Sequence, residues 1–388
     1  MQSQKLLFGV DYFLRHAGKF SHLHFALVTN NAATTSTGTA SRIALLRQGI
    51  KLLKLFSPEH GLTAQGEDGA SQTNTTDIMT GLPVISLYGD RLRPSREDLA
   101  DVDAILFDIP DAGCRFYTYL WTMTYIIEAC AELNKQLFIL DRPNPISGDL
   151  NLVEGPILDE INCSSFIGRW PIPIRHSCTF GELANYFAAT RVKNLDLQIV
   201  KVQNWDRQQA VRDAGWLFVP PSPAITDAET ALLYPGIGLL EGINVNEGRG
   251  TGYPFKIFGA PWINADEMHE AFKKLKLPGV IARPYSYEPI SGVYSNEKCC
   301  GLRFDVSDIT SFRPVRTGFE LINLITFLYR DHCNERAYKT AANPSGERHL
   351  DKLTGVYQSF ERLKNMDAEL CWDLSGWEEV ISAHLLYR

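Results

Sequence analysis

Short apolar runs alternate with amphipathic stretches over the first half of the chain, and this alternation restricts the possible folds more than any other feature. Six runs are predicted to be strands, at 24–29, 50–56, 84–86, 104–108, 136–140 and 197–202. Helix-like segments lie between them, at 39–48, 118–133 and 179–189. Strands that alternate with helices indicate a mainly parallel sheet covered on both faces. We therefore predict an α/β fold that begins with a Rossmann-like domain over residues 1–215.

The character of the chain changes at Val219-Pro-Pro-Ser-Pro223, where three prolines in five residues mark a connection. A glycine-rich loop at 242–252 follows, and then shorter mixed elements with helix-like segments near 318–329 and 350–365. These features predict a smaller α+β domain over residues 216–388.

Composition and missing motifs exclude several classes of protein. The 388 residues include 38 Lys and Arg against 45 Asp and Glu, for a formal net charge of −7. No block of Lys or Arg is present, which argues against a nucleic acid partner. Neither GxGxxG after the first predicted strand nor GxxxxGK(S/T) occurs anywhere, so we expect no NAD, no ATP and no other cofactor.

Cysteine usage and the N-terminus bear on the compartment. The eight cysteines are scattered without a CxxC pair, so we expect reduced thiols and no metal site. The N-terminus shows no signal peptide, and no apolar run approaches the ~18 residues of a membrane span. We therefore expect a cytoplasmic protein with no membrane partner; a chain trimmed of an export signal, periplasmic or secreted, would look identical. The sequence leaves monomer and homodimer open.

The segment Leu55-Phe-Ser-Pro-Glu-His-Gly61 places an ionisable pair, Glu59 and His60, just after a predicted buried strand. Ligands of open α/β sheets bind in the crevice beyond the carboxyl ends of such strands. A carboxylate and an imidazole there are candidates for acid–base catalysis. The alternative is structural: Glu59 would cap the following turn, and His60 would pack against it.

The predicted strand at 104–108 also ends in a cluster of polar residues. Asp111, Arg115, Tyr117 and Tyr119 follow Asp108 closely, and together they could hold a ligand rich in hydroxyl groups. In the alternative reading, Asp108 or Asp111 forms a salt bridge to Arg115 while the tyrosines cover the edge of the sheet. That alternative suits any one of these residues better than it suits the whole cluster.

A third predicted strand leads into Asp141-Arg-Pro-Asn-Pro145, where two prolines stiffen a loop that presents Arg142 and Asn144. Further along, Arg175 and His176 stand just before Thr179-Phe-Gly-Glu182, a capping-box pattern that predicts a helix start. Arg175 could receive a carboxylate through a bidentate contact. A structural role for His176 is the more common outcome for one histidine.

The loop at 241–252 alternates charge with glycine more tightly than a plain surface loop would. Its charged residues are Glu241, Glu247 and Arg249, and its glycines permit close approach of the backbone to a ligand. This pattern favours a ligand clamp.

Taken in order, these segments resemble the exo-β-N-acetylmuramidase family, the NamZ-like enzymes of glycoside hydrolase family 171, formerly a domain of unknown function. The similarity runs from about Val10 to the C-terminus. It rests on Thr29-Asn30, SPEHG (57–61), GLPVISLYG (81–89), DAGCRFYTY (111–119), LDRPNP (140–145), EGPIL (154–158), PIRH (173–176), PPSP (220–223), EGRGT (247–251) and GAPW (259–262). The chain departs from the family's usual residues at Thr63-Ala64, Pro110, Ser177-Cys178 and Ala224, which bears on the exact substrate more than on the reaction.

The resemblance implies release of N-acetylmuramic acid from the non-reducing end of peptidoglycan fragments, in a cleft between two domains. It also implies that Glu59 is the catalytic glutamate, which agrees with its place after a strand. Glycoside hydrolysis needs a second group; the candidates are Asp111, Glu241 and Glu247, or the acetamido group of the substrate.

Substrate binding is expected from Asn30 and from the polar residues of the strand ends and loops. Arg115, Arg175 and Arg249 are candidates for the lactyl carboxylate of muramic acid, because an arginine suits a carboxylate. Two rival functions stay open at this stage: a non-catalytic muropeptide-binding protein, and a hydrolase of another anionic amino sugar.

Overall fold

A seven-stranded sheet forms the larger part of the computed structural model, which describes residues 5–365, 372 and 374–387. Its spatial order is β3-β4-β2-β1-β5-β6-β7, and every neighbouring pair is parallel except β3–β4. The strands are β1 His24–Val28, β2 Lys51–Ser57, β3 Thr75–Thr76, β4 Pro83–Ser86, β5 Ala104–Phe107, β6 Gln136–Leu140 and β7 Leu197–Val200. The six predicted strands are all present, and the short edge strand β3 is additional.

Helices cover both faces of this sheet, as the alternation of the sequence predicted. On β1, Phe25 and Leu27 pack with α1 (Gly9–Arg15) and α2 (Ser41–Arg47), whereas Ala26 and Val28 face α3 (Tyr119–Leu133) and α5 (Phe180–Thr190). Successive side chains of a strand point to opposite faces, so a strand buried on both faces is apolar throughout. The predicted capping box is confirmed: the Thr179 hydroxyl accepts from the Glu182 amide, and the Glu182 carboxylate accepts from the Thr179 amide.

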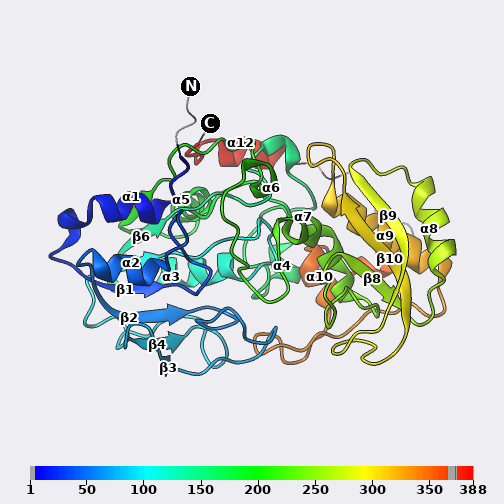
Figure 1. The fold of residues 1–388 in the computed structure, drawn as a ribbon, viewed down its shortest axis with the longest axis horizontal. Helices are drawn as coiled ribbons and strands as arrows, with labels where there is room; N and C mark the ends of the chain where they lie inside the picture. The colour runs from blue at the N-terminus through cyan, green and yellow to red at the C-terminus, as the bar shows by residue number, and fades with distance from the viewer. Residues whose placement is uncertain (1–4, 366–371, 373, 388) are drawn as a thin grey trace.

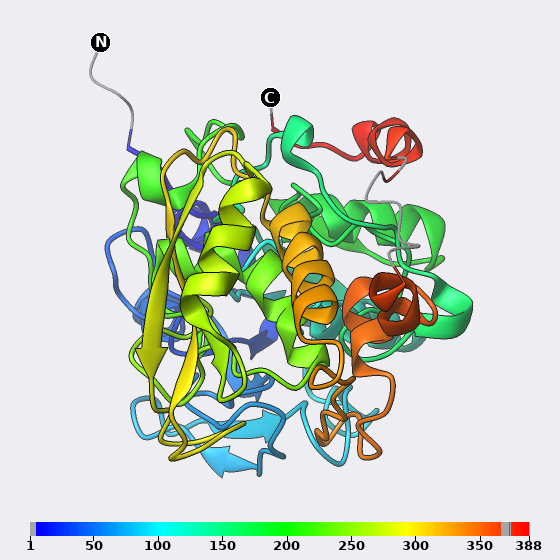
Figure 2. The ribbon, with the colours of Figure 1, turned by 90° about the vertical axis from the view of Figure 1, so that its right-hand side faces the viewer.

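A smaller α+β unit follows, which together with the parallel sheet confirms the predicted fold class. Its antiparallel sheet has the order β8-β10-β9, from Ile257–Ala260, Cys299–Val306 and Val280–Tyr287. Its helices are α7 Ala228–Ile237, α8 Ala265–Lys274, α9 Pro314–Leu328, α10 His349–Thr354 and α11 Ser359–Lys364, with the 3₁₀ segment η3 Gly238–Gly242 after α7. Figure 1 places this unit to the right of the seven-stranded sheet, and Figure 2 turns α8 and α9 toward the viewer.

Two details of the second half differ from the simplest reading of the sequence. The single helix expected near 350–365 is wrong, because Gly355 adopts φ +74 and ends α10 before α11 begins. The helices α7 and α9 cross closely at Gly236 and Gly318, where a Cβ on Gly236 would lie 2.0 Å from the Pro314 carbonyl oxygen. This crossing fixes η3, which carries Glu241.

The end of the chain returns to the first domain. Helix α12 (Ser375–Ser382) packs on α5, with the Trp377 and Tyr186 rings 5.4 Å apart and the Trp377 indole donating to the His176 carbonyl. Figure 2 shows α12, in red, beside the green helix α5. The remaining short elements are α4 Glu160–Cys163, α6 Val211–Ala214, η1 Ala17–Phe20 and η2 Leu150–Leu152.

The sequence also predicted reduced thiols and the absence of a membrane span. The seven cysteines among the described residues are free, and Cys371 lies outside them. Within that same part of the chain, no helix has the length and apolar character needed to cross a membrane.

Candidate active site

A cavity opens beyond the carboxyl end of β2, between the large sheet and the smaller unit. Its volume is about 740 Å³, counting the part open to solvent. The lining comes from the loop after β2, Tyr88 beyond β4, the segment that enters α3, residues 165–167, the segment 222–225 before α7 and several segments of the smaller unit. Its polar members are Glu59, His60, Asp68, Tyr88, Tyr117, Thr118, Ser165, Ser222, Tyr234, Glu241, Arg249, Tyr338, Thr340, Asn343, His349 and Lys352.

Glu59 is held rigidly at one wall of this cavity. Its side chain is buried, one carboxylate oxygen (Oε1) accepts from the Gly69 amide at 2.9 Å, and the other (Oε2) accepts from the Thr118 hydroxyl at 2.7 Å. His60, at φ 65, turns the chain sharply after Glu59, and its Nδ1 lies 2.8 Å from the Gly66 carbonyl oxygen. The loop after β2 therefore closes on itself and presents Glu59 to the cavity.

Glu59 and Asp68 form a pair of carboxyl groups with opposite pKa shifts. Burial, and then the negative charge of Asp68, raise the pKa of Glu59 above its usual value. Partial removal from water works the same way on Asp68, but the Arg249 guanidinium, His60 and Tyr338 outweigh it and hold its pKa low. Two acids whose environments separate their pKa values in this way suit an acid and a charged partner.

At this cavity, Arg249 forms ion pairs with three acidic residues. Its guanidinium lies 3.0 Å from Asp68, 2.5 Å from Glu241 and 2.9 Å from Glu247. Burial works against ionisation of Glu241, yet Arg249 and His349 hold its pKa below the usual value. Glu247 is buried behind Arg249 and is not among the residues that line the cavity.

The Glu59, His60 and Asp68 side chains each offer one atom within 4.8 Å of the others, a spacing that could hold a metal ion. Two features of the surroundings disfavour a bound cation there. The guanidinium of Arg249 already pairs with Asp68, and the raised pKa of Glu59 favours a neutral carboxyl group. The donor set therefore fits acid–base chemistry better than metal binding.

Other residues predicted for the site lie away from this cavity. Asp111 and His176 face each other at 3.5 Å in the interior, where burial raises the pKa of Asp111 to about 7 and lowers that of His176 to about 3. Asp111 and Arg142 instead line a smaller cavity beyond β1, β5 and β6. Arg142 pairs with Asp108 at 2.7 Å and donates to the Thr34 carbonyl oxygen. The predicted alternative of a salt bridge to Arg115 does not occur.

Two of the three arginines considered for a carboxylate ligand are internal. Arg115 donates to the carbonyl oxygens of Pro156, Ile172 and Leu353, and burial lowers its pKa to about 10. Arg175 donates to the Ile146 carbonyl oxygen and lies 3.7 Å from Glu154. Both side chains brace buried backbone, so neither reaches the cavity.

The remaining candidates support the walls. Asn30 donates to the Tyr119 hydroxyl, which in turn donates to the Pro221 carbonyl oxygen, and the Tyr117 ring packs 4.7 Å from that of Tyr119. Of the three, only Tyr117 lines the cavity. Asn144 braces its loop by donating to the Cys178 carbonyl oxygen.

Several cavity residues were absent from the sequence-based candidates: Asp68, Tyr88, Thr118, Tyr338, His349 and Lys352. Two of them carried a signal: Thr118 begins a predicted helix and lies in the DAGCRFYTY run, and Tyr88 lies in the GLPVISLYG run. The others lie in loops or a short helix that no motif singled out.

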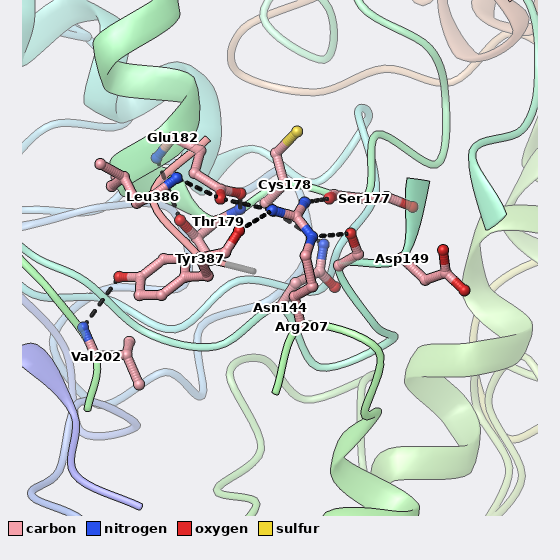
Figure 3. A network of polar contacts seen from close by, with 12 residues as sticks. Asn144, Asp149, Ser177, Cys178, Thr179, Glu182, Val202, Arg207, Leu386 and Tyr387 are labelled. Atoms are coloured by element: carbon pink, nitrogen blue, oxygen red, sulfur yellow. Dashed lines mark hydrogen bonds and ion pairs between the residues drawn. The ribbon is translucent and has the colours of Figure 1, made fainter. Parts of the chain in front are cut away.

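A second cluster of buried polar residues lies at the carboxyl end of β6 (Figure 3). The Asp141 carboxylate accepts from the Tyr387 hydroxyl at 2.6 Å and from Thr179 and the Gly181 amide. Arg207 joins Glu182 to the Tyr387 carbonyl oxygen, each at 3.0 Å. The end of the chain thus fills the space in front of this carboxylate.

The sequence matches a known protein family over most of its length. Residues 25–229 match the family described as "Exo-beta-N-acetylmuramidase NamZ, N-terminal", and residues 232–387 match its C-terminal counterpart. The peptidoglycan β-N-acetylmuramidase NamZ of Bacillus subtilis is 41% identical over 321 residues, which cover 82% of this chain and 76% of that protein.

Solved structures agree on the fold. A DUF1343 family protein from Bacteroides fragilis superposes with a TM-score of 0.87 at 28% identity, and a second one from that organism with 0.74 at 24%; each pair covers 99% of both chains. Both matched halves and the Bacillus relative agree with the resemblance seen in the sequence motifs. The chain therefore belongs to the NamZ exo-β-N-acetylmuramidase family.

Proposed function

We propose that this chain is a glycosidase that releases N-acetylmuramic acid from the non-reducing end of peptidoglycan fragments, with Glu59 as the general acid. Family membership supports the reaction class. The observation that supports the role of Glu59 is its place in the cavity: it is buried beside a second carboxylate, and its pKa is raised. A raised pKa keeps a carboxylic acid protonated until it can donate to the leaving oxygen.

Two of the hydrogen bonds of Glu59 bear on which oxygen carries the proton. Oε1 accepts from the Gly69 amide, which can only donate. Oε2 accepts from the Thr118 hydroxyl, which can rotate and accept instead. The proton therefore resides on Oε2 in the acid form, and Thr118 fits both protonation states.

Asp68 is the charged partner in this proposal. It stays ionised through Arg249 and Tyr338, and one of its oxygens lies within 4.8 Å of Glu59. A carboxylate there would stabilise the positive charge that develops at the anomeric carbon. Of the second groups suggested by the sequence, Asp111 and Glu247 lie outside the cavity lining, and Glu241 is engaged by Arg249 and His349.

The experiment that tests the function is release of 4-nitrophenol from 4-nitrophenyl β-N-acetylmuramide, with the N-acetylglucosaminide in parallel. We expect turnover of the muramide only. A folded protein that binds the muramide without cleaving it would contradict the proposal and indicate a muropeptide-binding protein. Equal turnover of both glycosides would indicate a broader hexosaminidase.

The pairing of Glu59 with Asp68 has its own test in the pH profile of kcat/KM. General-acid catalysis fails as pH rises through the pKa of the acid. Because the charge of Asp68 raises the pKa of Glu59, Asp68→Asn should shift the alkaline limb to lower pH as well as slow the reaction. An alkaline limb that stays in place would remove Asp68 from the neighbourhood of the acid.

A further inference from the structure

The lactyl carboxylate of muramic acid is the group that distinguishes this sugar from N-acetylglucosamine, and it needs a cationic partner in the site. This inference rests on the proposed function. Among the described residues that line the cavity, the Lys and Arg side chains are Arg249 and Lys352. The choice between them follows from what each already contacts.

Arg249 is already neutralised. Three carboxylates, those of Asp68, Glu241 and Glu247, lie within 3.0 Å of its guanidinium nitrogens. Its side chain also lies over the Phe255 ring, 4.7 Å from the ring centroid, which fixes its position. A fourth carboxylate would meet a cluster with more negative than positive charge, and like charges that close repel.

Lys352 has neutral partners instead. Its ammonium donates to the Asn343 side-chain oxygen and to the Glu347 carbonyl oxygen, each at 2.9 Å. Ion pairs are present elsewhere on α10, yet no carboxylate of the described residues lies within 4 Å of the Lys352 nitrogen. An ammonium group has three N–H donors, so one donor stays available to a ligand.

The position of Lys352 on α10 directs it to the cavity. His349, Lys352 and Leu353 all line the cavity, and residues three and four apart share one face of a helix. Asn343, which also lines the cavity, holds the ammonium from the preceding loop. The lysine is half-buried, so a charge there is less screened than on the open surface.

We propose that Lys352 binds the lactyl carboxylate of N-acetylmuramic acid and thereby sets the preference for muramic acid over N-acetylglucosamine. The carboxylate of the sugar replaces water at the third N–H of the ammonium. Glu59 and Asp68, which line the same cavity, act on the glycosidic bond, and Lys352 determines which sugar is held there.

Lys352→Met, which keeps the apolar stem and removes the charge, tests this. We expect kcat/KM for 4-nitrophenyl β-N-acetylmuramide to fall by roughly 10- to 100-fold, mainly through KM, since a hydrogen bond to a charged group is lost. Turnover of the lactyl methyl ester of the same glycoside should be unchanged, because the ester carries no charge. Lys352→Arg should keep most of the preference for the acid.

Two controls separate this inference from the proposed function. Lys273→Met, on the exposed face of α8, removes a lysine that pairs with Glu270 and should leave the turnover of both substrates unchanged. Calorimetric binding of free N-acetylmuramic acid and of N-acetylglucosamine tests recognition without cleavage. If Lys352→Met keeps the wild-type discrimination in both assays, the inference is overturned; a wild type that discriminates in binding but cleaves nothing contradicts the proposed function alone.

Discussion

Glu59 and Asp141 occupy equivalent places in the sheet and differ in what lies before them. Each follows the carboxyl end of a parallel strand, β2 or β6, and each is buried with a raised pKa, to about 6 for Asp141. In front of Glu59 lies a cavity. In front of Asp141 lies Tyr387, whose hydroxyl is 2.6 Å from the carboxylate.

The difference shows that a buried acid at a strand end is not by itself a catalytic feature. Burial raises the pKa of both carboxyl groups for the same reason, the loss of water around the charged form. What separates them is room for a ligand and a charged neighbour such as Asp68. We expect variants at the two positions to give opposite outcomes.

The largest effect should come from replacing each of the two acids in its own variant and comparing the two proteins. Glu59→Gln should lower kcat by about 10²- to 10⁴-fold with an unchanged melting temperature, because a positioned acid is lost and the volume is kept. Asp141→Ala should leave kcat of the folded protein intact and lower the free energy of unfolding by about 3 kcal/mol, since three buried donors lose their acceptor. Turnover and urea unfolding of both proteins provide the check, and a Glu59→Gln enzyme with near-normal kcat would exclude Glu59 as the acid.

The second effect concerns pH. The pKa of Asp141 is about 6 in the folded protein and about 3.8 in the unfolded chain. The folded state therefore binds more protons between these two pH values. Stability from this group is therefore present at low pH and is lost as pH rises. Compared with Asp141→Asn, wild type should lose about 2 kcal/mol between about pH 4.5 and about pH 7.5. Other buried acids are common to both proteins and cancel, so parallel curves would contradict the assignment.

A smaller effect is expected from Tyr387→Phe. The Tyr387 hydroxyl donates to Asp141 and accepts from the Val202 amide, and the variant leaves both without that partner. We expect a loss of about 1–2 kcal/mol in urea unfolding. The kcat for the muramide should not change, which would show that this cluster serves the fold alone.

The smallest effect should come from Tyr338→Phe at the cavity. The Tyr338 hydroxyl donates to Asp68 and helps hold its pKa low. Without this bond, kcat should fall by about 2- to 10-fold, because Arg249 still neutralises Asp68. Tyr357→Phe, a partly exposed tyrosine over Arg348, is the matched control and should have no effect.

Much of the fold was predictable from local pattern. The strand from 136 to 140 matches β6 at both ends, and the capping box at Thr179 marks the start of α5. These elements are set by periodicity and by side chains three residues apart, which a sequence displays directly. The break between α10 and α11 was missed because a glycine inside a helical pattern does not reveal its positive φ.

The site was only partly predictable. Glu59 could be placed from its strand, and Glu241 with Arg249 from an unusual loop, but Asp68, Tyr338 and Lys352 reach the cavity through long-range packing. The sequence also could not distinguish arginines at the cavity from arginines that stabilise the interior. Arg115 and Arg175 stand in motifs as distinctive as that of Arg249, yet they donate to buried backbone carbonyl oxygens. Burial depends on the whole fold and leaves no local mark.

The return of the chain end to the first domain has a mechanical consequence. The smaller unit is joined to the parallel sheet at its beginning, through the segment before α7, and again at its end, through α12 and Tyr387. Further contacts cross between the two units, from Arg249 to Asp68 and from Arg115 to the Leu353 carbonyl oxygen. The smaller unit is therefore held at both of its ends and across the cavity, and weakening the contact at Tyr387 would loosen one of these attachments while the others stay in place.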